Sequence, residues 1–225
     1  MRGAIITVAT MLALSGCGAS GNVAEAPPLT TYTLNIQASP ESLADVLDER
    51  LSDLGGHTVR DKAGLRISVP EGTNVDALRY RVGTIGKFGI YEVIDRGDGS
   101  DSLVLSTLNG ESLQLRTPAS MGSDCIADAQ AGDNPAGMQG QVVNFTFTAK
   151  CAESFGVLTS KNVGNRLAIV IDDAIISAPS IRTPILAGTG FIEGGWNERA
   201  ADVAAILRSG PLPVPAALGT EIGDD

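Results

Sequence analysis

Alternating and helically spaced apolar positions predict an α+β arrangement over residues 31–95. Apolar and polar residues alternate through 31–37, which predicts a half-buried strand. Ser39 as N-cap and Pro40 as the first helical residue then indicate the start of a helix. The apolar positions of this helix are Leu43, Val46, Leu47, Leu51 and Leu54.

The same region continues with two short strands, a second helix and a further strand. The strands are expected at 58–60 and 65–69, and the last strand covers 88–94. The helix is capped by Asn74 and has Val75, Leu78, Val82 and Ile85 on one face. This order, β-α-β-β-α-β, is typical of ferredoxin-like folds, in which two helices cover one face of a four-stranded sheet. We therefore predict a ferredoxin-like base over residues 31–95.

The middle of the chain, residues 96–140, is predicted to form a hairpin and a connector. Two apolar runs, 103–105 and 113–115, flank an Asn-Gly turn, which is a strong hairpin signal. A second hairpin is expected between 124–130 and 141–147, across a segment rich in Gly, Asn and Pro.

Residues 141–215 are expected to form a second α+β subdomain, the head, with an antiparallel sheet, and 216–225 a C-terminal tail. Two apolar runs flank Asp172-Asp173, which predicts a tight hairpin. A helix capped by Asn197 follows. Its apolar face is Ala200, Val203, Ala204 and Leu207.

The N-terminus indicates the compartment. A positive charge and a short apolar core in residues 1–16 have the proportions of a signal peptide. Cys17 follows Leu-Ser-Gly, a pattern that resembles the lipobox of bacterial lipoproteins; the alternative is an ordinary secretory signal with an incidental cysteine. We expect a diacylated Cys17, a tether over 17–30 and a periplasm-facing protein held by its lipid. Gly18 in place of aspartate slightly favours the outer membrane over the inner one.

Charge and motifs narrow the function classes. The net charge of −10 repels phosphate backbones, which disfavours nucleic-acid binding. The single histidine, His57, has no evident catalytic partner near it in sequence, and metalloprotease and nucleophile-elbow patterns are absent. Adjacent side chains such as Asp172 and Asp173 point apart, so a turn role is favoured over a cation site. We expect no enzyme, no catalytic residue, no metal and no cofactor.

Two further cysteines, Cys125 and Cys151, remain for an oxidising compartment. If the hairpin after residue 124 has a simple register, Cys125 lies opposite residues 147–151. This favours a disulfide that contributes about 3 kcal/mol. The alternative is two buried free thiols.

Several segments resemble the first large periplasmic domain of SecD, a membrane subunit of the complex that assists Sec-dependent protein export. In chain order they are 128–132, 142–147, 162–170, 176–179, 183–185, 207–210 and 212–215. The resemblance implies that the C-terminal half corresponds to the head of that domain. More weakly, it implies that the β-α-β-β-α-β half corresponds to its base.

The chain also departs from the SecD pattern. Asp173 stands where the family usually has glycine, Trp196 stands where it has phenylalanine, and Cys125 and Cys151 look like additions. SecD continues into a proton-conducting membrane region after this domain, so we expect the 225-residue chain by itself not to act as a proton-driven motor.

The resemblance and the envelope address together suggest two functions. The first is a non-catalytic polypeptide-binding or accessory module, with Sec translocase components or exported polypeptides as partners. The second is a structural or small-ligand-binding lipoprotein that retains only the fold. Candidate partner-binding residues are Phe145, Phe147, Gly188, Gly190 and Trp196, with the edge of the 142–147 strand as a site for strand addition.

Overall fold

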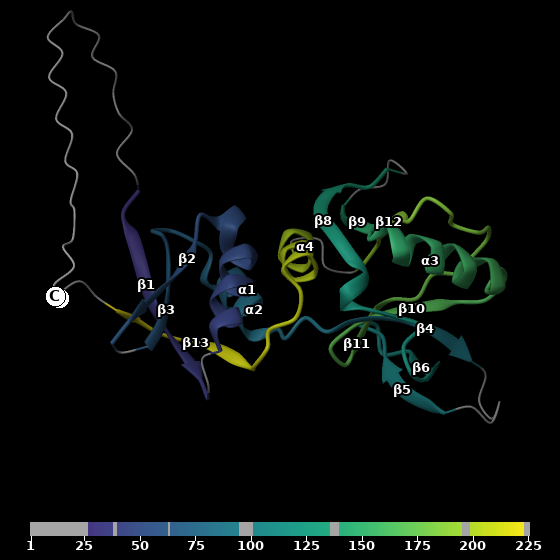
Figure 1. The fold of residues 1–225 in the computed structure, drawn as a ribbon, viewed down its shortest axis with the longest axis horizontal. Helices are drawn as coiled ribbons and strands as arrows, with labels where there is room; N and C mark the ends of the chain where they lie inside the picture. Colours follow the sequence, from purple (N-terminus) through teal and green to yellow (C-terminus); the bar gives the residue numbers. More distant parts are fainter. Residues whose placement is uncertain are drawn as a thin grey trace, which may run out of the picture.

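The protein folds into two lobes, a base and a head, with one helix between them (Figure 1). The computed structural model describes residues 27–37, 40–62, 64–94, 101–135, 140–194 and 199–222. Within them, no helix is long and apolar enough to cross a membrane. The predictions for Cys17, Ser39, Trp196 and Asn197 lie outside the described residues.

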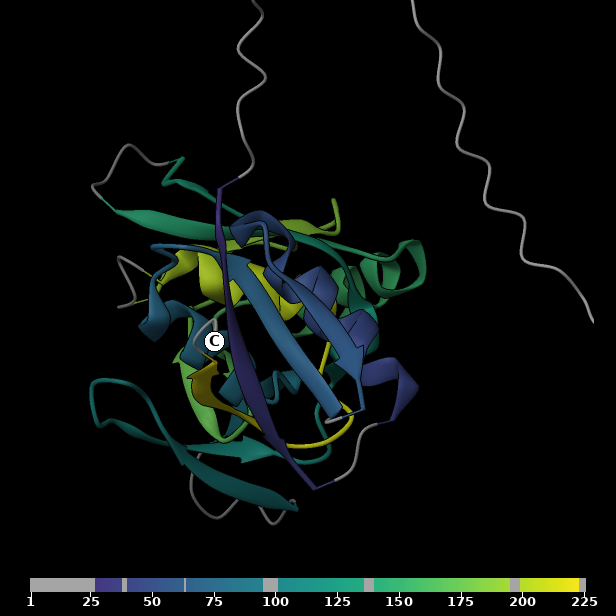
Figure 2. The ribbon, with the colours of Figure 1, turned by 90° about the vertical axis from the view of Figure 1, so that its left-hand side faces the viewer.

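The base is a four-stranded antiparallel sheet in the order β13-β1-β3-β2. Its strands are β1 (Leu29–Ile36), β2 (His57–Asp61), β3 (Gly64–Pro70) and β13 (Ala216–Ile222). Helices α1 (Glu41–Leu51) and α2 (Val75–Gly83) cover the face nearest the head, and η1 (Ser52–Leu54) follows α1. Seen from the base end, the strands cross in front of these helices (Figure 2). The apolar stripes predicted for both helices pack against this sheet, except for Val75 at the start of α2, which is exposed.

The fourth strand of the base differs from the prediction. The strand expected there, β4 (Phe88–Ile94), lies in the middle of the head sheet, between β10 and β6. Its first three residues are all buried, which suits a strand covered on both faces better than the one-sided base sheet. The segment expected as a tail supplies the missing strand as β13, with Ala216 opposite Ile36. The predicted fold class, a ferredoxin-like base plus an α+β head, is confirmed, and the head is an insertion between α2 and β13.

The head contains two antiparallel sheets. The first has the order β11-β10-β4-β6-β5, with β7 paired to β4, and the second has the order β12-β9-β8. Its elements besides β4 are β5 (Ser102–Ser106), β6 (Ser112–Arg116), β7 (Met121–Gly122), η2 (Ser123–Cys125), β8 (Ile126–Asp133), β9 (Gln141–Phe147), α3 (Ala149–Lys161), β10 (Leu167–Ile171), β11 (Ala174–Ser177), β12 (Thr189–Ile192) and α4 (Ala200–Ser209). All three predicted hairpins are confirmed. The strands expected as a hairpin and connector are thus part of the head sheets.

Two predicted helix caps can be compared with the structure. Asn74 caps α2, since its Oδ1 accepts from the amides of Asp76 and Ala77 at 2.9 and 3.1 Å. Pro40 precedes α1 in an extended conformation instead of occupying its first turn. The first helical residue of α1 is therefore Glu41.

The hairpin turn between β10 and β11 places Asp172, not Asp173, in the left-handed region, with φ at 54°. The Asp172 carboxylate accepts from the amides of Gly86 and Lys87, both at Oδ1, at 3.0 and 2.8 Å. These bonds compensate the strain of a left-handed residue that is not glycine. The aspartate therefore ties the head hairpin to the segment that leaves the base.

The predicted pairing of Cys125 and Cys151 is present as a disulfide, with 5.4 Å between the Cα atoms. The register that suggested it is also observed, because Ile126 lies opposite Phe147 and the Thr148 amide donates to the Cys125 carbonyl at 2.9 Å. The disulfide joins η2 to the first turn of α3.

Helix α4 connects the two lobes. It lies against α1 and α2 of the base and against β8 of the head (Figure 1). A polar cluster around two buried arginines, here called the junction, forms where α1, η1, α2 and α4 meet. Its residues are Arg50, Asp53, Arg81, Asp202 and Ser209.

Arg50 is fully buried at the centre of the junction. Its guanidinium donates to Ser209 Oγ at 3.0 Å and to four carbonyls. These belong to Arg81 at 2.8 Å, Thr84 at 2.6 Å, Ile85 at 3.2 Å and Gly210 at 2.6 Å. The carbonyls lie at the C-terminal ends of α2 and α4, where the helix dipole is negative. Burial lowers the pKa of Arg50 to about 10, which still leaves it charged at neutral pH.

Arg81 is also buried, and two carboxylates pair with it. Its Nε donates to Asp202 Oδ1 at 2.6 Å. Nη1 and Nη2 both donate to the Asp53 carboxylate, and Nη1 also donates to the Arg50 carbonyl at 2.9 Å. Burial acts to lower the pKa of Arg81, but the hydrogen bonds to Asp53 and Asp202 outweigh it and raise that pKa. Burial acts to raise the pKa of Asp53, and the hydrogen bond from Arg81 reverses this and lowers it.

Candidate functional site

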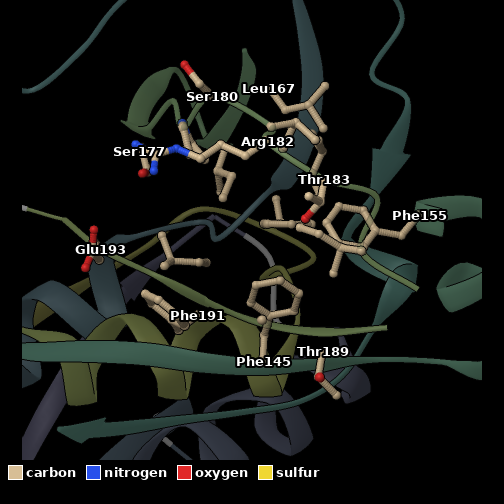
Figure 3. Close-up of a pocket in the computed structure, with 18 residues that line it drawn as sticks. Phe145, Phe155, Leu167, Ser177, Ser180, Arg182, Thr183, Thr189, Phe191 and Glu193 are labelled. Carbon is tan, nitrogen blue, oxygen red and sulfur yellow. The ribbon is translucent and has the colours of Figure 1, made fainter. Parts of the chain in front are cut away.

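The head contains a largely apolar cavity of about 690 Å³ between its two sheets (Figure 3). It is bordered by β4, β9, β10, β12, the inner face of α3 and the segment 177–185. Its apolar lining residues are Phe88, Ile90, Phe145, Phe155, Leu167, Ile169, Ile181, Ile185, Phe191 and Ile192. A cavity of this size is in the range that holds ligands or several large side chains.

Two backbone segments face the cavity from opposite walls. On one wall, five consecutive residues, 189–193, all line it. Because side chains alternate between the two faces of a strand, consecutive lining residues mean that the edge of β12 borders the cavity. On the other wall, the residues 179–183 line it in the same continuous way. The cavity is therefore open to two backbone edges as well as to side chains.

The charged groups of the cavity lie at one side. In Figure 3 the charged ends of Arg182 and Glu193 are on the side away from Phe155. Glu193 accepts from the amide of Asn134 at 2.8 Å. Arg182 is exposed and has no ion-pair partner among the described residues. One end is thus aromatic and the other carries one cation and one anion.

Of the predicted partner-binding residues, Phe145 and Gly190 line the cavity. Gly190 lies over Phe145, where an added Cβ would come within 2.7 Å of Phe145 Cζ. The backbone of β12 can therefore lie this close to the Phe145 ring because residue 190 is glycine.

Phe147 and Gly188 do not line the cavity and instead take part in the packing of the head. Phe147 packs in the core with its ring centroid 5.0 Å from that of Phe155. Gly188 has φ at +65° and lies against Ala152 of α3, where no Cβ would fit. The expected free edge along 142–147 is wrong, because β9 is the central strand between β12 and β8. The free edge near this site belongs to β12.

Sequence reasoning missed Phe191, Arg182 and Phe155 as cavity residues. A sequence signal for Phe191 was present, since it is an aromatic residue in a short segment that contains glycine. In the structure its side chain is 42% exposed. No signal in the sequence could show that the 179–183 segment lies across from β12, because that proximity depends on how the two sheets pack.

The arrangement suits binding. The described residues contain no cluster of three or more His, Cys, Asp or Glu side chains that could hold a metal ion. His57 is exposed on β2 of the base, outside the head cavity. The cavity offers apolar surface, backbone hydrogen-bonding groups and two charges.

Comparison with known proteins identifies the family. The sequence model of the SecDF P1 head subdomain matches residues 101–214. The chain belongs to this SecDF P1 head family. Most of the cavity lies within the matched stretch, and only Phe88 and Ile90 come from outside it.

Curated relatives match over about half of this chain. Protein translocase subunit SecD of Rickettsia bellii is 36% identical over 120 residues, which is 50% of this chain and 23% of the relative. Protein translocase subunit SecDF of Thermus thermophilus is 41% identical over 118 residues, which is 49% of this chain and 16% of the relative. The chain thus spans less than a quarter of the length of these relatives.

Solved structures extend the similarity to the base. A crystal structure of SecDF in a super-membrane-facing form matches 86% of this chain and 30% of that one, with a TM-score of 0.64 and 25% identity. A second structure, from work on SecDF as a membrane component that enhances protein export, covers 88% of this chain and 100% of that chain. Its TM-score is 0.61 at 24% identity, so it supports the fold alone.

Proposed function

We propose that this protein binds segments of exported polypeptides in the head cavity, on the periplasmic side of Sec-dependent export. The observation that carries the proposal is an open apolar cavity bordered by a free strand edge, within the stretch that matches the SecDF head family. An unfolded secretory chain presents both apolar side chains and unpaired backbone groups. The cavity offers surfaces complementary to both.

Site-specific photocrosslinking in living cells tests this proposal. A photoreactive phenylalanine analogue at Phe191 is expected to crosslink to a secretory protein arrested during export. The matched control is Val59, which has a similar exposure, 39% against 42%, but lies on β2 of the base. Equal crosslinking from both positions, or none from Phe191, would contradict the proposal.

We further propose that Cys17 carries the lipid that holds the protein at the membrane, with the outer membrane slightly favoured. The support is the Leu-Ser-Gly-Cys sequence after a short apolar core. Labelling with a clickable palmitate analogue should mark the wild-type protein, and Cys17→Ala should lose the label. Persistent labelling of Cys17→Ala would exclude the anchor.

A second candidate function is that of an envelope lipoprotein that binds a small apolar molecule. The cavity volume of about 690 Å³ favours it, since small-molecule sites usually measure about 300–1,000 Å³. Native mass spectrometry of protein extracted from membranes would show a constant added mass under this alternative. Deletion of the gene would then leave the rate of protein export unchanged.

A further inference from the structure

The free edge of β12 has a defined set of unpaired backbone groups. Within the described residues, β12 pairs only with β9. The amide of Phe147 donates to the carbonyl of Gly188 at 2.9 Å, which makes this a hydrogen-bonded pair of the ladder. Such pairs alternate with non-hydrogen-bonded ones in antiparallel strands, so Thr189 and Phe191 occupy non-hydrogen-bonded positions. Their N–H and C=O groups therefore point away from β9.

Within the described residues, this short edge lacks two common protections against pairing, a charged residue and a proline. Proteins commonly cover free edges or place charges or proline on them. The edge strand β2 of the base, for example, contains Arg60 and Asp61. The β12 residues, Thr-Gly-Phe-Ile, include neither a charge nor a proline, and the edge opens into the apolar cavity. An added strand would thus find both backbone partners and space for its side chains.

The opposite wall of the cavity, formed by residues 179–183, favours a ligand that carries a negative charge. Arg182 is the cation among the cavity-lining residues, and no described residue forms an ion pair with it. The nearby anion, Glu193, already accepts a hydrogen bond from the side-chain amide of Asn134. A carboxylate on an incoming chain would give Arg182 the partner that the described part of the protein does not provide.

We propose that an extended polypeptide segment adds to β12 as a fourth strand, places large apolar side chains at alternate positions in the cavity, and pairs a carboxylate with Arg182. This inference rests on the proposed polypeptide-binding function and specifies how the same site selects its ligand. Backbone pairing to Thr189 and Phe191 supplies affinity that tolerates many sequences. Alternation and the acidic residue supply the preference among segments.

Backbone methylation of a peptide ligand tests strand addition. The probe is a labelled nine-residue peptide with leucine or phenylalanine at alternate positions, threonine between them and glutamate near one end, titrated with the full chain by fluorescence anisotropy. Within the central residues, N-methylation is expected to weaken binding about five-fold at every second position and to have little effect in between, because alternate amides face β12.

The outcomes separate the two proposals. If the parent peptide binds and every methylated peptide binds equally well, strand addition is wrong while polypeptide binding stands. If peptides of this composition do not bind at all, the proposed function itself fails.

Two substitutions of Phe191 test whether the backbone amide of β12 contributes to peptide binding. Phe191→Ala removes the ring and keeps the amide, whereas Phe191→Pro removes both. The lost amide faces the free edge, so the pairing of β12 with β9 keeps its hydrogen bonds. Phe191→Pro should bind the parent peptide about five-fold more weakly than Phe191→Ala. Equal binding would overturn strand addition; if Phe191→Pro does not fold, as judged by circular dichroism, the methylation series decides.

Two peptides, one with glutamate and one with glutamine, test whether Arg182 recognises a carboxylate. Arg182→Gln should weaken binding of the glutamate peptide about two- to five-fold, the range of exposed ion pairs, and leave its glutamine counterpart unchanged. Arg79→Gln, an exposed arginine of the base, is the matched control and should affect neither peptide. An equal loss for both peptides with Arg182→Gln would refute recognition of a carboxylate.

Discussion

The head cavity and the junction between base and head differ in how far their polar groups are hydrogen-bonded. The junction buries two arginines and satisfies them with carboxylates, helix-end carbonyls and a serine hydroxyl. The cavity is lined mainly by apolar side chains, yet no strand of the described residues pairs with the cavity-facing edge of β12. In the junction every guanidinium N–H of Arg50 has an acceptor, whereas at the cavity the free edge of β12 keeps backbone groups available.

This difference indicates which region holds the protein together and which one binds. Buried charges are costly unless they are paired and hydrogen-bonded, so the junction favours one relative position of base and head. An unpaired strand edge next to apolar space gains hydrogen bonds only when another chain arrives. The following predictions test this contrast.

Removal of Arg50 should have the largest effect. Arg50→Met retains much of the side-chain volume but leaves the carbonyls at the ends of α2 and α4 without their donor. We expect a loss of about 3–5 kcal/mol in the free energy of unfolding, measured in urea. Arg79→Met, which breaks an exposed pair with Asp76, is the control and should cost below about 1 kcal/mol. Similar losses for the two variants would contradict the role of the junction.

Breaking the disulfide should have the next largest effect. Cys151→Ser removes a link between residues 26 positions apart in the sequence. The expected loss is about 3 kcal/mol, because the unfolded head regains conformational freedom. Cys125→Ser should cost a similar amount, and the double variant should cost no more than either single one. A urea midpoint that dithiothreitol leaves unchanged would show that the wild-type protein has no such bond.

Substitution in the cavity should barely change stability. Phe191 is 42% exposed, so Phe191→Ser is expected to alter the free energy of unfolding by within about 0.5 kcal/mol. The same variant should reduce binding of the labelled peptide. If Phe191→Ser destabilised the protein as strongly as Arg50→Met does, the contrast between the two regions would be lost.

The acid dependence of stability is the smallest predicted effect. Burial acts to raise the pKa of Asp53, but the hydrogen bond from Arg81 holds that pKa below its usual value in the folded protein. A carboxyl with a lowered folded pKa stabilises the fold above its unfolded pKa, near 4, and this contribution is lost as the pH falls through the folded value. Asp53→Asn should therefore flatten the decline in stability below about pH 4. An unchanged acid limb in urea titrations would argue against the pairing with Arg81.

The hairpins and the disulfide were accessible from the sequence because their determinants are local. The Asn-Gly turn is enough to predict the hairpin of β5 and β6. Simple counting of the register across the hairpin of β8 and β9 is enough to place Cys125 near Cys151. The helical faces of α1 and α2 were likewise readable, since a periodic apolar stripe is buried wherever the helix packs. The cap at Asn74 depended only on its neighbours.

Several assignments depended on contacts between distant segments. Whether Phe88–Ile94 or Ala216–Ile222 completes the base sheet depends on strand pairing across the whole chain, and both segments have strand-like patterns. Similarly, Arg50 on α1 and Arg81 on α2 are buried where these helices meet α4, and no local sequence pattern predicts this. Their burial follows from the position of a helix more than one hundred residues away in the sequence.

The sequence by itself determined the α+β class and the local hairpins, because short-range periodicity and turn motifs encode them. It also favoured the pairing of Cys125 with Cys151, and its matching segments carried the resemblance to the first periplasmic domain of SecD. Only the tertiary structure decided that β9 is central, that β12 has the free edge, and that Phe191 and Arg182 border one cavity. Those features arise from the packing of two sheets, and the side-chain pattern of one strand does not say which neighbour it lacks.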